Sequence, residues 1–147
     1  MISWPSLLSL AHLIGLVLGI GCATAKLTLL LRCRTDNSFA ATFVAVTRPV
    51  TRLIILGLVL LTLSGIGWLV IGYSITPLLV VKLVMVGTIW VLGPVIDNVI
   101  EPKFQKLAPG PGESVSPAFI RIWQRYLVLE GIATGLFYVI VVMWVLF

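Results

Sequence analysis

Four long apolar runs constrain this chain more than any other feature of its sequence. They cover residues 7–31, 53–73, 78–99 and 126–146. Each is long enough to cross a hydrocarbon layer of roughly 30 Å, which takes about 20 helical residues. Because lipid offers the backbone no hydrogen-bond partners, an apolar segment of this length has to be helical. The sequence therefore predicts an all-α fold, a transmembrane four-helix bundle that forms a single domain over residues 1–147.

The composition argues against a soluble fold. Of the 147 residues, 60% are hydrophobic and only 10% are charged, whereas a soluble domain carries about 25% charged residues. The net charge of +5 does not indicate nucleic-acid binding, because the basic residues flank the apolar runs instead of forming one basic face. The first predicted partner is therefore the lipid bilayer, and nucleic acid is not predicted as a partner.

The basic residues predict how the chain crosses the membrane. Nine of the ten flank the first and third connections between the apolar runs, and Lys82 is the exception. The nine are Lys26, Arg32, Arg34, Arg48, Arg52, Lys103, Lys106, Arg121 and Arg125. Since cytoplasmic loops carry an excess of Lys and Arg, both connections are predicted inside and both termini outside, N-out/C-out. The expected location is the bacterial inner (cytoplasmic) membrane, as a multi-pass protein.

The three connections differ in length and character. Residues 73–77 (YSITP) leave so little chain that the second and third helices should form a tight antiparallel hairpin. The first connection, residues 32–52, is longer and could include an interfacial turn of helix. The third contains a polar linker at residues 108–114, followed by a basic, aromatic lead-in to the fourth run. Trp123 and Tyr126 are expected at the inner membrane surface, in the aromatic belt.

Five polar or ionisable residues fall within the apolar runs: His12, Lys26, Lys82, Asp97 and Glu130. Such groups at membrane depth usually face the bundle interior and are candidates for function. By position, His12 and Lys82 share the outer third, and the other three lie near the inner ends. The inner three are predicted to form a structural polar cluster in which at least one acid pairs with Lys26 or Arg125. Snorkelling of Lys26 to the headgroups is the alternative.

Small residues indicate the faces on which the helices pack. His12, Gly15 and Gly19 recur at three- or four-residue spacing, so they share one stripe of the first helix. Gly15 and Gly19 form a G-x-x-x-G pair, which lets another helix backbone approach closely. Gly131 and Gly135 repeat this spacing in the fourth run. All four glycines are therefore predicted at helix packing contacts.

His12 is the only histidine in the chain. A lone histidine can simply hydrogen-bond a facing helix, but neutral imidazole is also a ligand for a haem iron or another tetrapyrrole metal. A bis-His haem within one protomer is excluded, so any sixth ligand would come from Lys82, water or a partner. The candidate metal ligand is therefore His12, the candidate cofactor-binding residues are His12 and Lys82, and the candidate cofactor is haem b or another tetrapyrrole.

Three segments carry a resemblance to a known group: HLIG at residues 12–15, RPVTRLIILGLVLLTLSG at 48–65 and TPLLVVKLVMV at 76–86. The chain resembles the small four-helix bacterial integral membrane proteins. This group includes uncharacterised predicted membrane families, the CopD-type copper-resistance domain and membrane-bound protoporphyrinogen oxidase. In the last of these, a first-helix histidine and a third-helix lysine are implicated at the haem site, and the resemblance assigns these positions to His12 and Lys82. The chain lacks the further His and Met of the copper branch and is most similar to the uncharacterised branch.

The sequence contains no recognisable catalytic motif: it has no G-x-S-x-G, P-loop, H-E-x-x-H or dinucleotide fingerprint. No catalytic residue is therefore assigned. We expect a non-catalytic accessory subunit of a larger membrane complex, which packs against other membrane protein subunits through its small-residue helix faces. Two alternatives stay open. One is a haem-binding membrane redox protein that uses His12 and Lys82, and the other is a small-solute or ion carrier.

Overall fold

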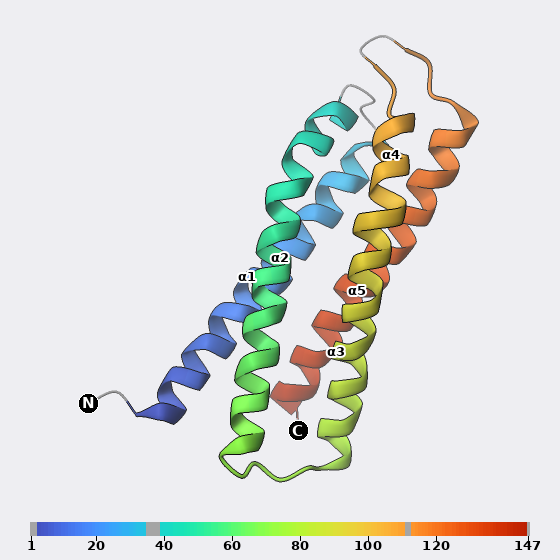
Figure 1. Ribbon diagram of the computed structural model, residues 1–147. Coiled ribbons are helices and arrows are strands. Elements are labelled where there is room, and N and C mark those ends of the chain that lie inside the picture. The colour runs from blue at the N-terminus through green and yellow to red at the C-terminus, as the bar shows by residue number, and fades with distance from the viewer. Residues whose placement is uncertain (1–2, 35–38, 111–112, 147) are drawn as a thin grey trace.

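The computed structural model describes residues 3–34, 39–110 and 113–146, and every regular element in this part of the chain is helical (Figure 1). The predicted all-α fold is confirmed. The polar linker predicted at residues 108–114 lies partly outside the described residues. In chain order the elements are α1 (Trp4–Arg32), α2 (Phe39–Val70), α3 (Pro77–Val95), the π-helix η1 (Ile96–Ile100), α4 (Glu101–Leu107) and α5 (Pro117–Leu146).

In the described part of the chain, four helical rods are long and apolar enough to cross a membrane, as predicted. They are Trp4–Arg32, Thr42–Val70, Pro77–Leu107 and Pro117–Leu146, and the third combines α3, η1 and α4. The rods extend well beyond the predicted runs, so most of the first connection is helical and the fourth rod starts before residue 126. The reason is that Lys, Arg, Glu and Gln lower hydropathy without ending a helix, because they are good helix formers.

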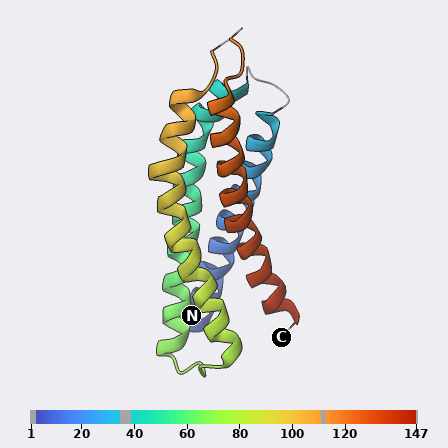
Figure 2. The same ribbon diagram turned by 90° about the vertical axis from the view of Figure 1, so that its right-hand side faces the viewer.

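The two ends of the bundle differ in what they carry. One end, called here the hairpin end, holds the connection over residues 71–76 together with both chain termini (Figures 1 and 2). The other, called the basic end, holds the connections that follow Arg32 and Leu107 (Figure 1). The nine basic residues that flank these two connections therefore gather toward one end of the molecule.

Local sequence explains the turn at the hairpin end. Gly72 follows α2 with a φ of 104°, in the left-handed region that favours glycine after a helix. Thr76 then caps α3, because its hydroxyl accepts a hydrogen bond of 3.2 Å from the Leu79 N–H. Pro77 occupies the first turn, where its missing N–H costs nothing.

The closest helix pair is α1 and α2, and three glycines make this contact possible. A Cβ on Gly57 would lie 2.5 Å from Gly19 N and 2.8 Å from the Gly15 carbonyl oxygen. A Cβ on Gly15 would lie 2.8 Å from the Gly57 carbonyl oxygen. Only residues without side chains let two backbones approach this closely. The structure thus places Gly15 and Gly19 at a helix contact, opposite a third glycine that the G-x-x-x-G pattern did not indicate.

The packing prediction for Gly131 and Gly135 is wrong. A Cβ on either residue would meet no atom of another helix within 4 Å. The face of α5 that packs inward instead contains the buried residues Ala133, Thr134 and Phe137. A four-residue glycine spacing indicates that two small residues share a face, but it does not say whether that face meets another helix.

The second and third helices form an antiparallel hairpin through a short connection, as predicted, but the prediction that they pack tightly together is wrong (Figure 1). Although α2 and α3 are consecutive, α1 packs against α2 and α5, and α3 packs against α5. A hydrogen bond of 3.0 Å from Trp90 Nε1 to Thr62 Oγ1 links α3 to α2. The short connection fixes the distance between the helix ends but not the distance between their middles.

Most of the buried apolar side chains lie toward the basic end. The larger apolar cluster lies there and includes the buried side chains of Leu30, Phe43, Phe104 and Tyr126. A second, smaller cluster lies farther toward the hairpin end. Its buried members are Ala23, Leu58, Ile89 and Phe137. Much of the larger cluster therefore comes from helical extensions that are too polar to appear as apolar runs.

A π-helical turn interrupts the third rod beside the larger cluster. The Glu101 N–H donates to the Ile96 carbonyl oxygen, five residues back instead of four. Pro102 follows, and in a regular α-helix its ring would clash with the carbonyl of Asn98. The wider turn gives this ring room. Such turns often accompany functional sites, and this one contains Asp97 and leads directly into Glu101.

Candidate functional site

Lys26 lies at the centre of a buried ionic cluster. Its ammonium nitrogen is 3.3 Å from Asp97 Oδ1, 3.5 Å from Glu130 Oε2 and 3.7 Å from Glu101 Oε2. Lys26 is only 2% exposed, and Glu130 and Glu101 are 3% and 7% exposed. The structure therefore brings together the three residues of the predicted polar cluster and adds a third carboxylate, Glu101.

Glu101 is held through both of its carboxylate oxygens. The Tyr126 hydroxyl donates to Oε2 at 3.2 Å, and Gln105 Nε2 donates to Oε1 at 3.3 Å. Tyr126 is fully buried, and its ring centre lies 5.5 Å from the Lys26 ammonium, within cation–π range. Asp97 is the most accessible acid of the cluster, with a side chain that is 24% exposed.

Helical spacing explains how these side chains meet. Asp97 and Glu101 are four residues apart, as are Tyr126 and Glu130, so each pair shares one helix face. Lys26 projects from α1 between the two faces and contacts carboxylates from both. The cluster thus links three rods of the bundle at one level.

An aromatic layer covers the cluster on the side of the basic end. Phe43, Phe104 and Tyr126 pack edge to face, with ring centres between 5.4 and 5.9 Å apart. Beside them, Trp123 Nε1 donates to the Leu30 carbonyl oxygen at 2.9 Å. This layer excludes water on that side of the cluster, and an unpaired charge in such surroundings is costly.

The cluster contains more acid than base. Three carboxylates face one ammonium group, so the fully ionised cluster carries an excess of two negative charges. Within the described part of the chain, every ion pair involves Lys26, and no second cation lies within 4 Å of these acids. Excess negative charge at membrane depth attracts protons or other cations.

A cavity of about 270 Å³ adjoins the cluster on the side of the hairpin end. Lys26, Asp97 and Glu130 line it at the cluster, and the remaining walls are mostly apolar. Its α2 and α3 walls include Ile55 and Trp90, which are 45% and 38% exposed. The cavity therefore opens between α2 and α3, the two consecutive helices that do not pack closely.

Two hydroxyl groups near this region lack hydrogen-bond partners among the described residues. They are Thr51 Oγ1, whose residue lines the cavity, and Thr134 Oγ1 on α5. A buried polar atom without a partner costs about 1–3 kcal/mol. A polar group of a bound molecule beside Thr51 would remove this cost.

His12 and Lys82 lie away from the ionic cluster. His12 Nδ1 is 2.8 Å from Ser64 Oγ on α2, and this hydroxyl in turn donates to the Leu60 carbonyl oxygen at 2.7 Å. His12 therefore has a structural partner on a facing helix.

Neither His12 nor Lys82 lines the cavity beside Lys26, and neither lines a second cavity at the basic end. Among the described residues, no three His, Cys, Asp or Glu side chains are placed to hold a metal ion. A haem at His12 stays a prediction.

The aromatic-belt prediction is wrong for Trp123 and Tyr126. These residues are 8% and 0% exposed, because α5 begins at Pro117 and carries both side chains into the larger core. An aromatic residue with a polar atom suits the membrane surface, but it also suits a buried site that supplies a hydrogen-bond partner. Here the partners are the Leu30 carbonyl oxygen and Glu101.

Glu101 and the cavity have only weak signals in the sequence. Glu101 lies just beyond the predicted third run, and Pro102 after it normally ends a helix. The available signal is its four-residue spacing from Asp97. The cavity depends on how far apart the middles of two helices lie, and local sequence does not encode that distance.

Comparison of this chain with protein-family models, with curated proteins and with solved structures finds no match in any of the three.

Proposed function

We propose that this protein is a non-catalytic membrane carrier that binds a small amphipathic cation in the cavity between α2 and α3. The observation that carries the proposal is the excess of carboxylates over ammonium groups at one end of a cavity with apolar walls. Ionisable residues inside membrane proteins commonly line substrate or ion pathways. A cation offsets the unbalanced charge of Asp97 and Glu130, whereas an anion would increase it.

The walls of the cavity support an occupant with an apolar part. Trp90 and Phe137 contribute aromatic rings, which attract cations as well as apolar groups. Thr51 supplies a hydroxyl that has no hydrogen-bond partner among the described residues. Because the cavity opens between α2 and α3, a molecule that is dissolved in the bilayer would reach it sideways, and such a molecule has to be partly apolar.

Benzylamine is a suitable probe because it joins a cationic head to a single apolar ring. Calorimetric titration of the detergent-solubilised protein should show binding of benzylamine and weaker binding of benzyl alcohol, which has the same ring without the charge. Asp97→Asn removes one negative charge with little change in shape. We expect it to weaken benzylamine binding at least roughly tenfold, since tenfold is about 1.4 kcal/mol and a charge pair at 4 Å and ε of 20 contributes about 4 kcal/mol.

The matched control is Glu113→Gln. It also removes one acid, but Glu113 lies in the connection after α4, where it accepts a 2.9 Å hydrogen bond from the Gly110 N–H. Benzylamine affinity should be unchanged in this variant. Equal losses of benzylamine affinity in both variants, or equal affinity for benzylamine and benzyl alcohol, would contradict the proposed cation site.

Uptake of benzyltrimethylammonium, a permanent cation, into proteoliposomes tests transport separately. Asp97→Asn should reduce the rate of this uptake toward the rate of empty vesicles.

A second function, an accessory subunit of a larger membrane complex, is favoured by the exposed face of α3. In the described chain, Ile89 is the only buried residue of this helix, and Val84 and Val91 are 64% and 66% exposed. Apolar helices of other membrane subunits would pack against this face about as favourably as lipid does. A photo-crosslinking residue at position 84 should then yield a protein adduct of discrete mass in native membranes. Adducts with lipid alone would contradict a partner on this face.

We also propose that the basic end faces the cytoplasm of a bacterial cell, so that both termini lie outside the inner membrane. After replacement of Cys22 and Cys33 by serine, a cysteine at Ser74 should react with a membrane-impermeant maleimide added to intact spheroplasts. A cysteine at Ser114 should react only after permeabilisation. Both positions are exposed, so orientation alone decides the labelling. The reverse pattern would invert the proposed topology.

A further inference from the structure

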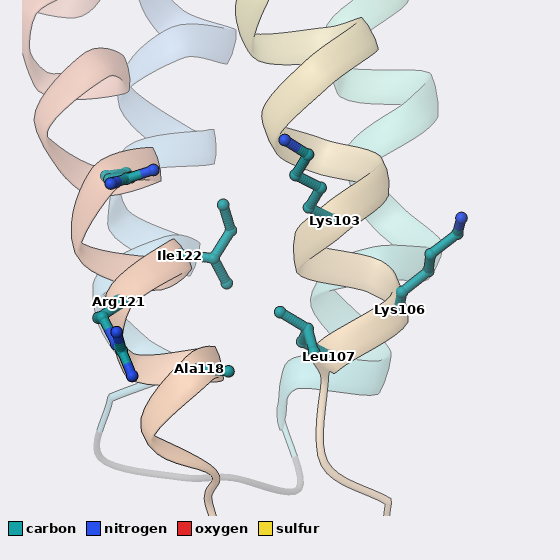
Figure 3. Close-up of a pocket in the computed structure, with 7 residues that line it drawn as sticks. Lys103, Lys106, Leu107, Ala118, Arg121 and Ile122 are labelled. Carbon is teal, nitrogen blue, oxygen red and sulfur yellow. The ribbon is translucent and has the colours of Figure 1, made fainter.

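A second cavity of about 480 Å³ lies between α4 and α5 at the basic end (Figure 3). Figure 3 shows Leu107 on α4 and Ile122 on α5 between the two helices. Four basic side chains line the same cavity. They are Lys103 and Lys106 from α4 and Arg121 and Arg125 from α5. The cavity therefore has an apolar floor and positively charged walls, and it is called here the basic groove.

Helical spacing places the positive charges along the rim of the groove, where in Figure 3 Lys103 lies toward the space between the helices and Lys106 and Arg121 point away from it. Lys103 and Lys106 are three residues apart, and Arg121 and Arg125 are four apart, so each pair shares a helix face and both faces border the groove. All four residues are exposed. Ion pairs in the described part of the chain involve only Lys26, so no carboxylate of the described residues forms an ion pair with any of these four side chains. An anion in the groove would relieve their mutual repulsion.

The position of the groove indicates which anion. The membrane-length helix Pro77–Leu107 ends there and the helix Pro117–Leu146 begins there. The ends of such helices lie where hydrocarbon gives way to lipid headgroups. Inorganic phosphate would use the charged walls but not the apolar floor formed by Leu107, Ala118 and Ile122. A phospholipid offers a phosphate for the walls and a glycerol and acyl part for the floor.

We propose that the basic groove binds the phosphate of one anionic phospholipid molecule. Arg121 and Arg125 supply guanidinium groups, which bind phosphate oxygens through paired N–H donors, and Lys103 and Lys106 add compact positive charges. Basic pockets between membrane helices on the cytoplasmic side are suited to such headgroups. This site is separate from the cation cavity beside Lys26, and neither proposal depends on the other.

Basic residues at this end could instead serve only to orient the chain in the membrane. Arg48 and Arg52 on α2 allow the two explanations to be separated. They lie toward the same end and are exposed, but they line neither cavity. The double variant Arg48→Gln/Arg52→Gln removes the same charge as Arg121→Gln/Arg125→Gln and leaves the groove intact.

Native mass spectrometry of the full chain in neutral detergent, with dioleoyl phosphatidylglycerol added, tests the proposal. We expect one retained phosphatidylglycerol molecule per wild-type chain and much less retention of phosphatidylcholine. Each Lys or Arg near a membrane surface contributes about 1 kcal/mol to binding of anionic lipid, so Arg121→Gln/Arg125→Gln should weaken retention roughly 30-fold. Arg48→Gln/Arg52→Gln should retain the lipid as wild type does. Circular dichroism should show both variants folded, because all four residues are exposed.

Three results would overturn the proposal. Equal losses in the two double variants would mean that the lipid responds to the general charge of the basic end. Equal retention of phosphatidylglycerol and phosphatidylcholine would mean that the phosphate charge is not what is bound. Displacement of the lipid by inorganic phosphate at the same concentration would identify the groove as a site for free phosphate instead of lipid.

Discussion

Replacement of Lys26 by methionine is expected to lower the free energy of unfolding by about 3–5 kcal/mol, because removing one partner of a buried ion pair leaves uncompensated charge. Methionine is unbranched and similar in length, so it preserves most of the packing around the side chain. It cannot balance the carboxylates of Asp97, Glu101 and Glu130, which all lie within 3.7 Å of the ammonium nitrogen. Equilibrium unfolding in mixed micelles, followed by circular dichroism, measures the loss.

Lys82→Met is the matched control for this prediction. Lys82 also lies in a membrane-length helix, but it forms no ion pair among the described residues. Its replacement should change the free energy of unfolding by about 0.5 kcal/mol or less. Adding Glu130→Gln to Lys26→Met removes one of the uncompensated charges and should recover part of the loss. Equal effects at Lys26 and Lys82 would show that the cluster stabilises the fold no more than a snorkelling lysine does.

The number of rods could be predicted because hydropathy is a local property. Any run of about 20 apolar residues is long enough to span lipid as a helix, whatever the rest of the chain does. The predicted link between Lys26, Asp97 and Glu130 followed from a similar argument, since charges at membrane depth need partners. Both inferences depend on the cost of polar groups in lipid, which holds without knowledge of the tertiary contacts.

The helical extensions were underestimated because hydropathy cannot detect a helix that is partly polar. Periodicity carries the missing signal in α5. Its buried residues Phe119, Ile122, Trp123, Tyr126 and Glu130 recur at spacings of three and four over a stretch that includes Arg121 and Arg125. This pattern is typical of an amphipathic helix packed on a core. It would have extended the fourth rod and moved Tyr126 from the membrane surface to the ionic cluster.

The glycine contacts could be predicted only in part. Gly15 and Gly19 are spaced for a close approach, but the partner residue, Gly57, is a single glycine whose position follows from the alignment of two whole helices. The same spacing at Gly131 and Gly135 occurs on a face with open space beside it. Spacing reports which residues share a face, and the tertiary arrangement decides what that face meets.

Gly57→Leu is expected to destabilise the bundle more than any other single glycine replacement. The new Cβ would lie 2.5 Å from Gly19 N and 2.8 Å from the Gly15 carbonyl oxygen. Both obstacles are backbone atoms, so no side-chain rotation relieves the clash and α1 has to move away from α2. Overpacking typically costs 1–3 kcal/mol and sometimes more, and we expect at least about 3 kcal/mol here. At Gly19 the nearest atoms belong to the Phe137 and Leu61 side chains, at 3.2–3.9 Å, so Gly19→Leu should cost less.

Gly65→Leu is the matched control, because Gly65 lies on the same helix and a Cβ there would meet nothing within 4 Å. It should be neutral or slightly stabilising, since glycine inside a helix costs about 1 kcal/mol relative to good helix formers. The displacement of α1 in Gly57→Leu would also move Lys26 relative to Asp97 and should weaken benzylamine binding, whereas Gly65→Leu should leave that binding intact. Equal unfolding free energies for the three leucine variants would show that the α1–α2 contact does not depend on direct backbone approach.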